Sequence, residues 1–520
     1  MRLEAKILVL AAAMILTRGS SAGQQFQLME ASIADIHGAL ESGKLTCRSL
    51  VQQYLDRINA YDQQGPSLNA MLYLNPQALE QADAMDKAFK RGAKLKPLQC
   101  IPLVLKDVFD TADMPTTGGS LALKGMQPTK DAFTVTRFRQ NGALILGKTN
   151  LHELALAGVT ASSLGGQTKN PYELTRTPGG SSGGTGVALA ANFATVGTGS
   201  DTVNSIRSPA SANSLVGLRP TRGLISRAGV IPVSFTQDAV GPLARNVADV
   251  AVMLDVMAGY DPEDPVTALG VGKIPATYTA FLDRKGLKGA RIGVLRTLFG
   301  SGPDHAEVNR VMAEALEALK NQGAVLVEIN DEAFDTGRLN AELDVQKYEY
   351  KSQLNNYLKA QPNAPVHSLA ELIATGNYHK PSLEKFLASA ESYENGLNEV
   401  DYKSRRVKID DLRVQLANVM AKNNVIALVY PHQKRLPVMI GDMNQAERNG
   451  ILASLAGFPA ITVPAGFSVP TASAPIGVPV GIEFLGQPFS EPQLLKIAYS
   501  FEQATHARKP PRSAPPLSSR

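Results

Sequence analysis

Apolar positions along the chain follow two alternating periods, one typical of buried strands and one typical of helices. The segment 101–105 (IPLVL) is a continuous apolar run, as expected for a strand buried on both faces. Between 308 and 319, apolar residues recur at every third or fourth position, which predicts a helix with one buried face. This helix lies between the apolar segments 290–295 and 324–329. Such a strand–helix–strand unit indicates parallel strands in an α/β sheet.

The apolar signal returns late in the chain, after a long polar interruption. Residues from about 332 to 421 are rich in Glu, Lys, Asn and Tyr and show helical spacing in several places, so we expect a helical excursion from the sheet. Three short apolar segments then follow, at 425–429, 459–463 and 480–484. We therefore predict an α/β fold with a large mixed, mostly parallel central β-sheet that is covered by helices on both faces.

Both ends of the chain differ from the rest. A weakly basic start precedes the apolar run 7–16 (ILVLAAAMIL), and small residues lead to Ala22, as in a secretory signal. The run is shorter than the roughly 20 residues that span a bilayer. We expect a signal peptide at 1–22, export to the periplasm or the outside of the cell, and no stable membrane insertion after processing. The remainder is expected to be a single domain, 23–510, with a loose tail at 511–520 that is rich in Pro, Ser and Arg.

Composition limits the possible functions. The chain has 520 residues, of which 44% are hydrophobic and 19% are charged, so it can bury a large core. The formal net charge is only +5, and no basic run is interleaved with aromatic residues, so nucleic acid is not an expected partner. Cys47 and Cys100 are too few for a disulfide framework. They either form one bridge in an oxidising compartment or are small buried residues.

The most distinctive chemistry lies between residues 177 and 220, where two serine-bearing, Gly-rich turns flank an apolar run. A flexible linker would not contain such a run, which must be buried. The first turn, 179–184 (GGSSGG), is not a phosphate-binding loop, because Thr185 stands where that loop requires lysine. A nucleophile elbow would need a strand before the turn, and 170–178 is a prolyl loop. The His, Glu and Cys positions show no tight metal-ligand spacing, so we expect no metal and no cofactor.

The motifs together resemble the amidase signature family, in particular its secreted, peptide amidase-like members. They are 179–184 (GGSSGG), 197–201 (GTGSD), 205–210 (SIRSPA) and 217–223 (GLRPTRG). The resemblance covers about residues 30 to 510. In that family a Ser–cis-Ser–Lys triad hydrolyses amides without a metal. The resemblance places the nucleophile at Ser205, the bridging serine with its cis peptide bond at Ser181, and the lysine at Lys106.

The side chains are suited to this chemistry. Serine is a weak nucleophile near neutral pH and needs a base. A lysine can be that base only when neutral, so burial must lower its pKa from about 10.4. The apolar strand 101–105 ends at the charged pair Lys106–Asp107, a site candidate in a desolvated setting. The Ser181 hydroxyl can relay the proton between Ser205 and Lys106, because it both accepts and donates hydrogen bonds.

Backbone donors for the developing oxyanion are expected at Thr202, Val203, Asn204 and Ser205. The family most often has two glycines where this chain has Val203 and Asn204. Backbone N–H donors survive that change, although a positive φ angle at Val203 would be costly. Three further residues are expected to position the two turns: Ser182, Asp201 and Arg207.

These observations predict an amidase that hydrolyses the C–N bond of a linear carboxamide to an acid and an amine or ammonia, through a serine acyl-enzyme. An ester hydrolase would use the same intermediate. Two alternatives remain: the glutaminase-type subunit of a tRNA-dependent amidotransferase, which the export signal argues against, and a non-catalytic binding protein, which the intact triad argues against. The expected partner is a small-molecule amide substrate, and a homodimer is compatible with the resemblance. The excursion, the loops 430–432 and 442–444, and the segment 235–238 (FTQD) are expected to shape the pocket.

Overall fold

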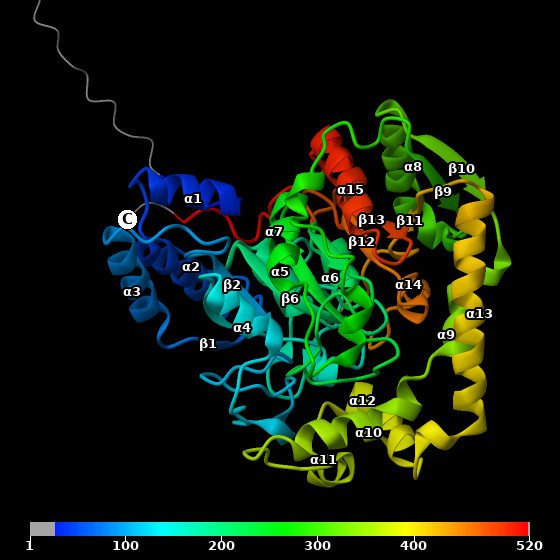
Figure 1. Cartoon of the computed structure of the whole chain (residues 1–520), viewed down its shortest axis with the longest axis horizontal. Helices are drawn as coiled ribbons and strands as arrows, with labels where there is room; N and C mark the ends of the chain where they lie inside the picture. Colours follow the sequence, from blue (N-terminus) through cyan, green and yellow to red (C-terminus); the bar gives the residue numbers. More distant parts are fainter. Residues whose placement is uncertain (1–25, 518–520) are drawn as a thin grey trace, which may run out of the picture.

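The computed structural model describes residues 26–517, so the expected signal peptide lies outside the described residues. The strands of the main sheet are β1 (Met71–Leu74), β2 (Pro102–Lys106), β3 (Leu144–Thr149), β6 (Val196–Asp201), β7 (Val216–Arg219), β8 (Ala239–Ala244), β9 (Arg291–Leu295), β10 (Val325–Ile329), β11 (Ala427–Pro431), β12 (Ala460–Phe467) and β13 (Pro479–Gly486). Their order is β1-β3-β2-β6-β8-β7-β12-β13-β11-β9-β10, and β4 (Ala161–Ser162) pairs with β5 (Gly166–Gln167) in a separate ribbon. The described chain is thus built on one 11-stranded sheet (Figure 1).

The helices of the described chain are α1 (Ile33–Glu41), α2 (Cys47–Tyr61), α3 (Ala78–Lys90), α4 (Phe133–Gln140), α5 (Gly183–Ala190), α6 (Arg207–Ala212), α7 (Val247–Met257), α8 (Ala306–Asn321), α9 (Thr336–Leu343), α10 (Gln346–Lys359), α11 (Leu369–Thr375), α12 (Lys380–Glu391), α13 (Val400–Lys422), α14 (Ile451–Ala456) and α15 (Glu491–Thr505). None of them is long and apolar enough to cross a membrane.

The sheet is mixed, as expected, but the prediction that it is mostly parallel is wrong. Parallel pairs occur in two groups, β2 with β3 and β6, and β9 with β10 and β11. The predicted unit β9–α8–β10 is one of these and is confirmed. All other neighbouring strands are antiparallel, and two of these pairs, β7 with β8 and β12 with β13, are consecutive strands with no helix between them. The connection from β12 to β13, for example, contains no helix and is too short for the crossover that two parallel neighbouring strands require.

Helices cover both faces of the sheet, as predicted. On β13, the side chain of Glu483 reaches Arg207 in α6, whereas the ring of the next residue, Phe484, packs against Phe501 in α15. Successive residues of a strand point to opposite faces, so α6 and α15 lie on opposite sides of the sheet. α5 contacts α6, and α15 contacts both α7 and α8, which completes the two helical layers.

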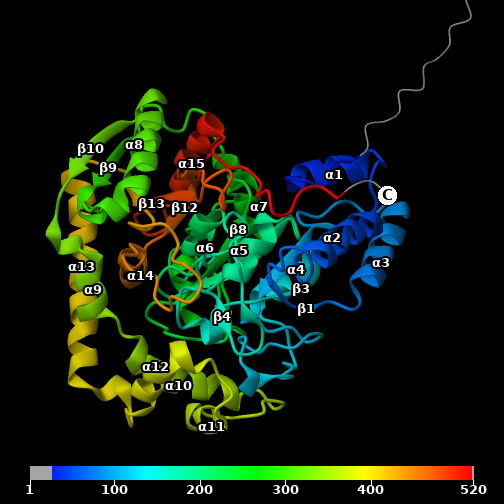
Figure 2. The same ribbon diagram turned by 180° about the vertical axis from the view of Figure 1, so that it is seen from behind.

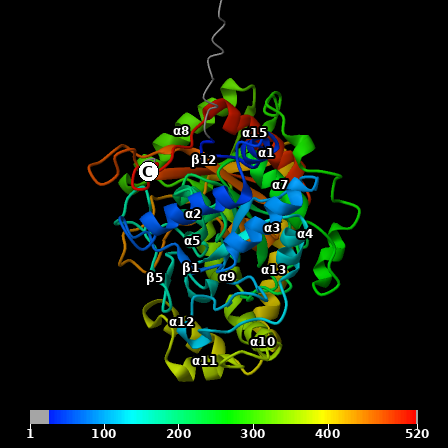
Figure 3. The ribbon, with the colours of Figure 1, turned by 90° about the vertical axis from the view of Figure 1, so that its left-hand side faces the viewer.

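The polar region after β10 forms the expected helical excursion, α9 to α13, without a strand between 332 and 422. In all three views α10, α11 and α12 lie together at one end of the molecule (Figures 1, 2 and 3). α13 runs along one side in Figures 1 and 2. The hydroxyl of Tyr357 in α10 donates to the carboxylate of Asp110 at 2.6 Å. Asp110 lies in the loop that follows β2, so the excursion covers the end of the sheet at which Lys106 is located.

The tail is not loose over its described part, which corrects the prediction for 511–517. The guanidinium of Arg57 in α2 donates to the carbonyl oxygens of Ala514 and Pro515, both at 2.8 Å. The Ser513 hydroxyl donates to the Pro171 carbonyl oxygen at 2.6 Å. Because Arg57 is buried and has no acidic partner among the described residues, these carbonyl oxygens satisfy its donors and hold the tail in place.

A network of buried charges connects strands β6, β7 and β13 to the start of α6. Arg207 donates to Asp201 at 3.0 and 3.1 Å and to Glu483 at 2.6 Å, and Arg219 donates to Asp201 at 3.0 Å. All four side chains have no solvent exposure. Burial alone would raise the pKa of both carboxyl groups, but the arginines outweigh it: the pKa of Glu483 falls to about 2, and that of Asp201 falls well below its usual range.

Cys47, at the start of α2, and Cys100, just before β2, form a disulfide bond with a Cα–Cα distance of 5.4 Å. The sequence alone leaves open whether these residues pair. The bond connects the N-terminal helices to the strand that carries Lys106, because β2 begins two residues after Cys100. It also closes a loop with a sequence separation of 53 residues, which restricts the unfolded chain.

Asp201→Asn is expected to lower the free energy of unfolding by about 3–5 kcal/mol, because two buried arginines then lose a charged partner. Denaturant unfolding measures the change. Asp410→Asn is the matched control: Asp410 pairs with Arg413 at 2.6 Å but is 65% exposed, so its loss should cost less than about 1 kcal/mol. Equal effects of the two substitutions would contradict the role given to the buried network.

The double substitution of Cys47 and Cys100 by alanine is expected to lower the free energy of unfolding by about 2–4 kcal/mol. Thiol titration of the unfolded wild-type protein gives a direct check, with reactive thiols appearing only after reduction. Thiols that react before reduction would show that the bond is not formed, and an unchanged thermal unfolding midpoint in the double variant would show that it does not contribute to stability.

Candidate active site

Lys106, at the end of β2, is fully buried and donates to two serine hydroxyls. Its Nζ lies 2.6 Å from Oγ of Ser181 and 2.8 Å from Oγ of Ser200, which is located in β6. Burial lowers the pKa of Lys106 to about 7, although the negative charges of Asp201 and Asp238 act in the opposite direction. A substantial fraction of this lysine is therefore neutral near neutral pH and can accept a proton.

Ser181 lies in the Gly-rich turn before α5, and its peptide bond to Gly180 is cis, as the resemblance implies. A Cβ atom at Gly180 would lie 2.8 Å from the carbonyl carbon of Gly158, so only glycine fits there. The carbonyl oxygen of Ser181 accepts a hydrogen bond from the His152 N–H at 3.0 Å. These contacts fix the backbone of the turn and direct the Ser181 hydroxyl to Lys106.

Ser205 lies in the turn between β6 and α6, and its side chain is 6% exposed. Its carbonyl oxygen accepts a hydrogen bond from the Ser182 N–H at 3.3 Å, and the Ser182 hydroxyl donates to the Ser200 carbonyl oxygen at 3.4 Å. Ser182 thus connects the two turns. The Ser205 hydroxyl makes no hydrogen bond within residues 26–517, so its expected bond to Ser181 is open in this structure.

The loop that includes Thr202, Val203, Asn204 and Ser205 has four backbone N–H groups that donate to no other group in the described chain. Neither Val203 nor Asn204 has a positive φ angle, so their side chains cause no backbone strain of that kind. The carbonyl oxygen of Val203 accepts hydrogen bonds from the Ser454 hydroxyl at 2.7 Å and from Arg207 at 2.8 Å. Free backbone N–H donors, on a loop whose carbonyl oxygen is fixed by hydrogen bonds, are suited to form an oxyanion hole.

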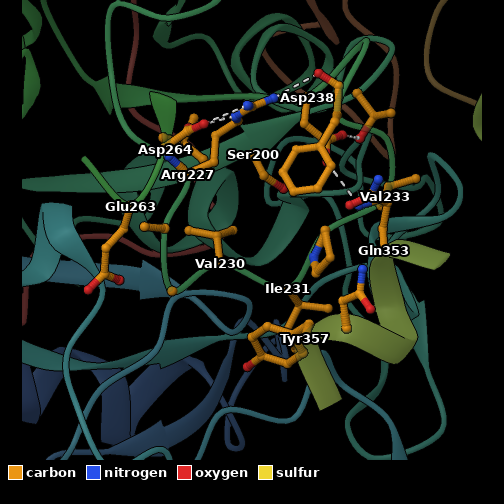
Figure 4. Close-up of a pocket in the computed structure, with 17 residues that line it drawn as sticks. Ser200, Arg227, Val230, Ile231, Val233, Asp238, Glu263, Asp264, Gln353 and Tyr357 are labelled. Carbon is orange, nitrogen blue, oxygen red and sulfur yellow. Dashed lines mark hydrogen bonds and ion pairs between the residues drawn. The ribbon is translucent and has the colours of Figure 1, made fainter. Parts of the chain in front are cut away.

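A cavity of about 290 Å³ opens beside these groups (Figure 4). Ser200 and Thr202 line its floor, and its walls are mainly apolar: Val230, Ile231, Pro232, Val233, Phe235 and Val240. The rim is polar and includes the Arg227–Asp264 ion pair at 2.8 Å and Tyr357 from α10. Phe235 and Asp238, from the expected pocket segment 235–238, line this cavity, and so do residues of α10 in the excursion. The loops 430–432 and 442–444, which were also expected to shape the pocket, do not line it.

Several residues near the candidate site are not among the site residues predicted from the sequence. Ser200, Asp238, His152 and Arg448 lie far apart along the chain but close to the two turns. The carboxylate of Asp238 accepts a hydrogen bond from the Thr202 hydroxyl at 2.7 Å. Ser200 lies within the motif GTGSD and Asp238 within the segment 235–238, which could have indicated them, whereas His152 and Arg448 lie in no such segment.

Asp107 does not belong to the site, although it follows Lys106. Its carboxylate pairs with Lys148 at 3.4 Å and accepts a hydrogen bond from the Thr117 N–H at 3.1 Å. The residue therefore supports the loop after β2. Within residues 26–517, no group of three or more His, Cys, Asp or Glu side chains is arranged to hold a metal ion.

Comparisons with known proteins identify the family of this chain. The amidase family model matches residues 49–495. A probable amidase of Arabidopsis thaliana is 36% identical, with 97% of each chain covered. A glutamyl-tRNA(Gln) amidotransferase subunit of Alkaliphilus metalliredigens is 33% identical, over 92% of this chain and 97% of that protein.

Solved structures give the same result. The native peptide amidase of Stenotrophomonas maltophilia has a TM-score of 0.83 at 38% identity, over 94% of this chain and 99% of that one. An amidase family protein of Bacillus anthracis has a TM-score of 0.80 at 32% identity, with 93% of both chains covered. From its sequence, its fold and the arrangement of its buried serines and lysine, this chain belongs to the amidase signature family of hydrolases.

Proposed function

We propose that this protein hydrolyses linear amides through a serine acyl-enzyme, with Ser205 as nucleophile, Ser181 as proton relay and Lys106 as base. The observation that carries the proposal is the 2.6 Å hydrogen bond between Lys106 Nζ and Ser181 Oγ in a fully buried setting. A buried lysine whose pKa is lowered to about 7 is suited to general base catalysis near neutral pH. No carboxylate or imidazole is hydrogen-bonded to either hydroxyl among the described residues, which leaves Lys106 as the base.

The reaction follows from this arrangement. The Ser205 oxygen attacks the amide carbon, and its proton passes through the Ser181 hydroxyl to Lys106. The tetrahedral oxyanion accepts hydrogen bonds from the N–H groups of residues 202–205. The C–N bond then breaks as Lys106 returns the proton, through Ser181, to the leaving amine. Water attacks the acyl-enzyme by the same relay and releases the acid. The open contact between Ser205 and Ser181 must close when substrate binds, as is common for catalytic hydrogen bonds.

The cavity supports an amide that carries an apolar group. Its volume of about 290 Å³ accommodates a side chain or an aryl group, and its apolar wall, formed by 230–233, Phe235 and Val240, can contact such a group. The similarity to peptide amidases supports a carboxamide substrate, and the same acyl-enzyme would form from an ester. We therefore place apolar carboxamides, anilides and peptide amides first among substrates.

A glutaminase-type function remains the second candidate, because relatives that are 33% identical over most of the chain are glutamyl-tRNA(Gln) amidotransferase subunits. That reaction requires glutamine and tRNA in the same compartment, which the expected export would prevent. Ammonia release from glutamine, stimulated by the partner subunits and aminoacylated tRNA, would favour this alternative. Turnover of simple amides by the chain alone would favour the amidase.

Ser205→Ala is expected to lower amide turnover at least about 10³-fold, and Lys106→Ala and Ser181→Ala at least about 10²-fold, because nucleophile, base and relay act as a unit. The measurement is amine or ammonia release from aliphatic amides, anilides, peptide amides and matching esters. Ser301→Ala, an exposed serine, is the control and should match the wild type. Full turnover by folded Ser205→Ala would place the chemistry elsewhere.

The rate is expected to rise with pH through about 7 and to level off above it, because the base acts only after Lys106 loses its proton. The measurement is kcat/KM from about pH 5 to about pH 10. Asp238→Asn sharpens the test: the negative charge of Asp238 raises the pKa of Lys106, so its removal should shift the midpoint to lower pH. An acidic optimum with loss of activity above neutrality, or a midpoint that moves upward in Asp238→Asn, would contradict Lys106 as the base.

A further inference from the structure

Arg448, between β11 and α14, carries a positive charge that no described acidic group neutralises. Its only hydrogen bond within residues 26–517 runs from Nη1 to Oδ1 of Asn204, at 3.2 Å. The side chain is partly buried. This burial lowers the pKa of Arg448 to about 10, and no neighbouring charge contributes to the shift. Arginines such as Arg207 and Arg219, by contrast, are paired with buried carboxylates. Arg57 also lacks a described acidic partner, but carbonyl oxygens accept from its guanidinium. Nε and Nη2 of Arg448 donate to no described group, so they are available to an anionic ligand.

The guanidinium lies between the two turns of the active site. Asn204, its hydrogen-bond partner, directly precedes Ser205. On its other side, a Cβ atom at Gly158 would collide with Nη1 of Arg448, so the group packs directly on that glycine. Gly158 in turn packs on Gly180, the residue before Ser181. Arg448 thus contacts Asn204, which precedes the proposed nucleophile Ser205. It also packs on Gly158, which in turn contacts Gly180, the residue before Ser181.

Two further polar atoms at this position have no hydrogen-bond partner in the described chain. They are Nδ2 of Asn204 and Nδ1 of His152, in side chains that are 1% and 0% exposed. His152 donates its backbone N–H to Ser181, and the charge of Arg448 lowers its pKa further after burial. Nε and Nη2 of Arg448 also donate to no described group. Asn204 belongs to the candidate oxyanion loop and His152 contacts the turn of Ser181, so these polar atoms lie beside the two turns.

We propose that Arg448 forms a carboxylate-binding subsite beside the nucleophile, so that preferred substrates are amides that carry a carboxylate as well as an apolar group. The proposal rests on the proposed function of Ser205. The two free edges of a guanidinium match the two oxygens of a carboxylate and form charge-assisted hydrogen bonds. The apolar cavity begins at Ser200 and Thr202, whereas Arg448 meets the loop at Asn204, so the two subsites flank the reacting carbonyl.

Two pairs of amides test this subsite. In the first, the 4-nitroanilide of succinic acid is compared with that of butyric acid, which lacks the carboxylate. In the second, N-butyryl-4-aminobenzoate is compared with N-butyrylaniline. The wild type is expected to show at least a tenfold higher kcat/KM for the carboxylate member of one pair. Arg448→Gln, which retains a donor for Asn204, should lower kcat/KM for that member at least tenfold more than for its neutral partner.

Arg435→Gln is the matched control. Arg435 lies on the same segment, but its guanidinium is already paired with Asp304 at 3.1 Å and with Glu447. Its substitution should leave the preference unchanged, which excludes a general effect of net charge. A preference that survives in Arg448→Gln, equal losses for both members of a pair, or no preference in the wild type would overturn the proposal. Equal losses would instead show that Arg448 only positions Asn204.

Binding separates this proposal from the proposed reaction. Calorimetric titration with succinate is carried out on Ser205→Ala and on the double variant with Arg448→Gln. If succinate binds at least tenfold more weakly to the double variant, the result supports the subsite, even when no amide is turned over. The lack of turnover would then contradict the proposed function and not the subsite. Amide turnover together with equal succinate affinity in the two variants would retain the amidase and reject the subsite.

Discussion

The charge of Asp201 holds the active site together. It faces two buried arginines, and one of them, Arg207, also reaches Glu483 on a distant strand. Three strands and the start of α6 therefore meet at one point, and the loop between Asp201 and Arg207 has little freedom. That loop contains Ser205 and the candidate oxyanion donors. A charge network is costly to bury, but once complete it positions the backbone more strictly than apolar packing does, because each partner would lose a charged hydrogen bond on moving.

Burial has opposite effects on the charged groups of the site. The carboxylates of Asp201 and Glu483 stay ionised because arginines adjoin them. Among the described residues, the partners of Lys106 are only serine hydroxyls and a carbonyl oxygen, so desolvation dominates and makes its proton easy to lose. Arg448 is desolvated without an acidic partner, yet a guanidinium keeps its charge at any physiological pH. The same environment thus suits Lys106 to the proposed role of base and Arg448 to the proposed role of binding group.

Relatives with this fold include amidases and amidotransferase subunits, so the shared sheet and the shared turns do not by themselves define a substrate. In this chain the segments outside the two Gly–Ser turns complete the surroundings of the site. The polar excursion covers the apolar cavity with α10, and the segment between β11 and α14 brings Arg448 to the oxyanion loop. Substrate choice is therefore expected to depend on these segments.

The sequence by itself determined the family, the α/β class and the unit β9–α8–β10, and it predicted roles for Lys106, Ser181 and Ser205. Local periodicity and long Gly–Ser motifs lie in consecutive residues and can be recognised without the fold. Strand direction in the centre of the sheet and the anchored tail were not predictable, because they depend on connections and on a buried arginine, Arg57, far away in the chain. Only the tertiary structure decided that Arg448 meets Asn204, 244 positions away, and that its charge has no described partner. Pairing between distant side chains follows from packing, and no local pattern encodes it.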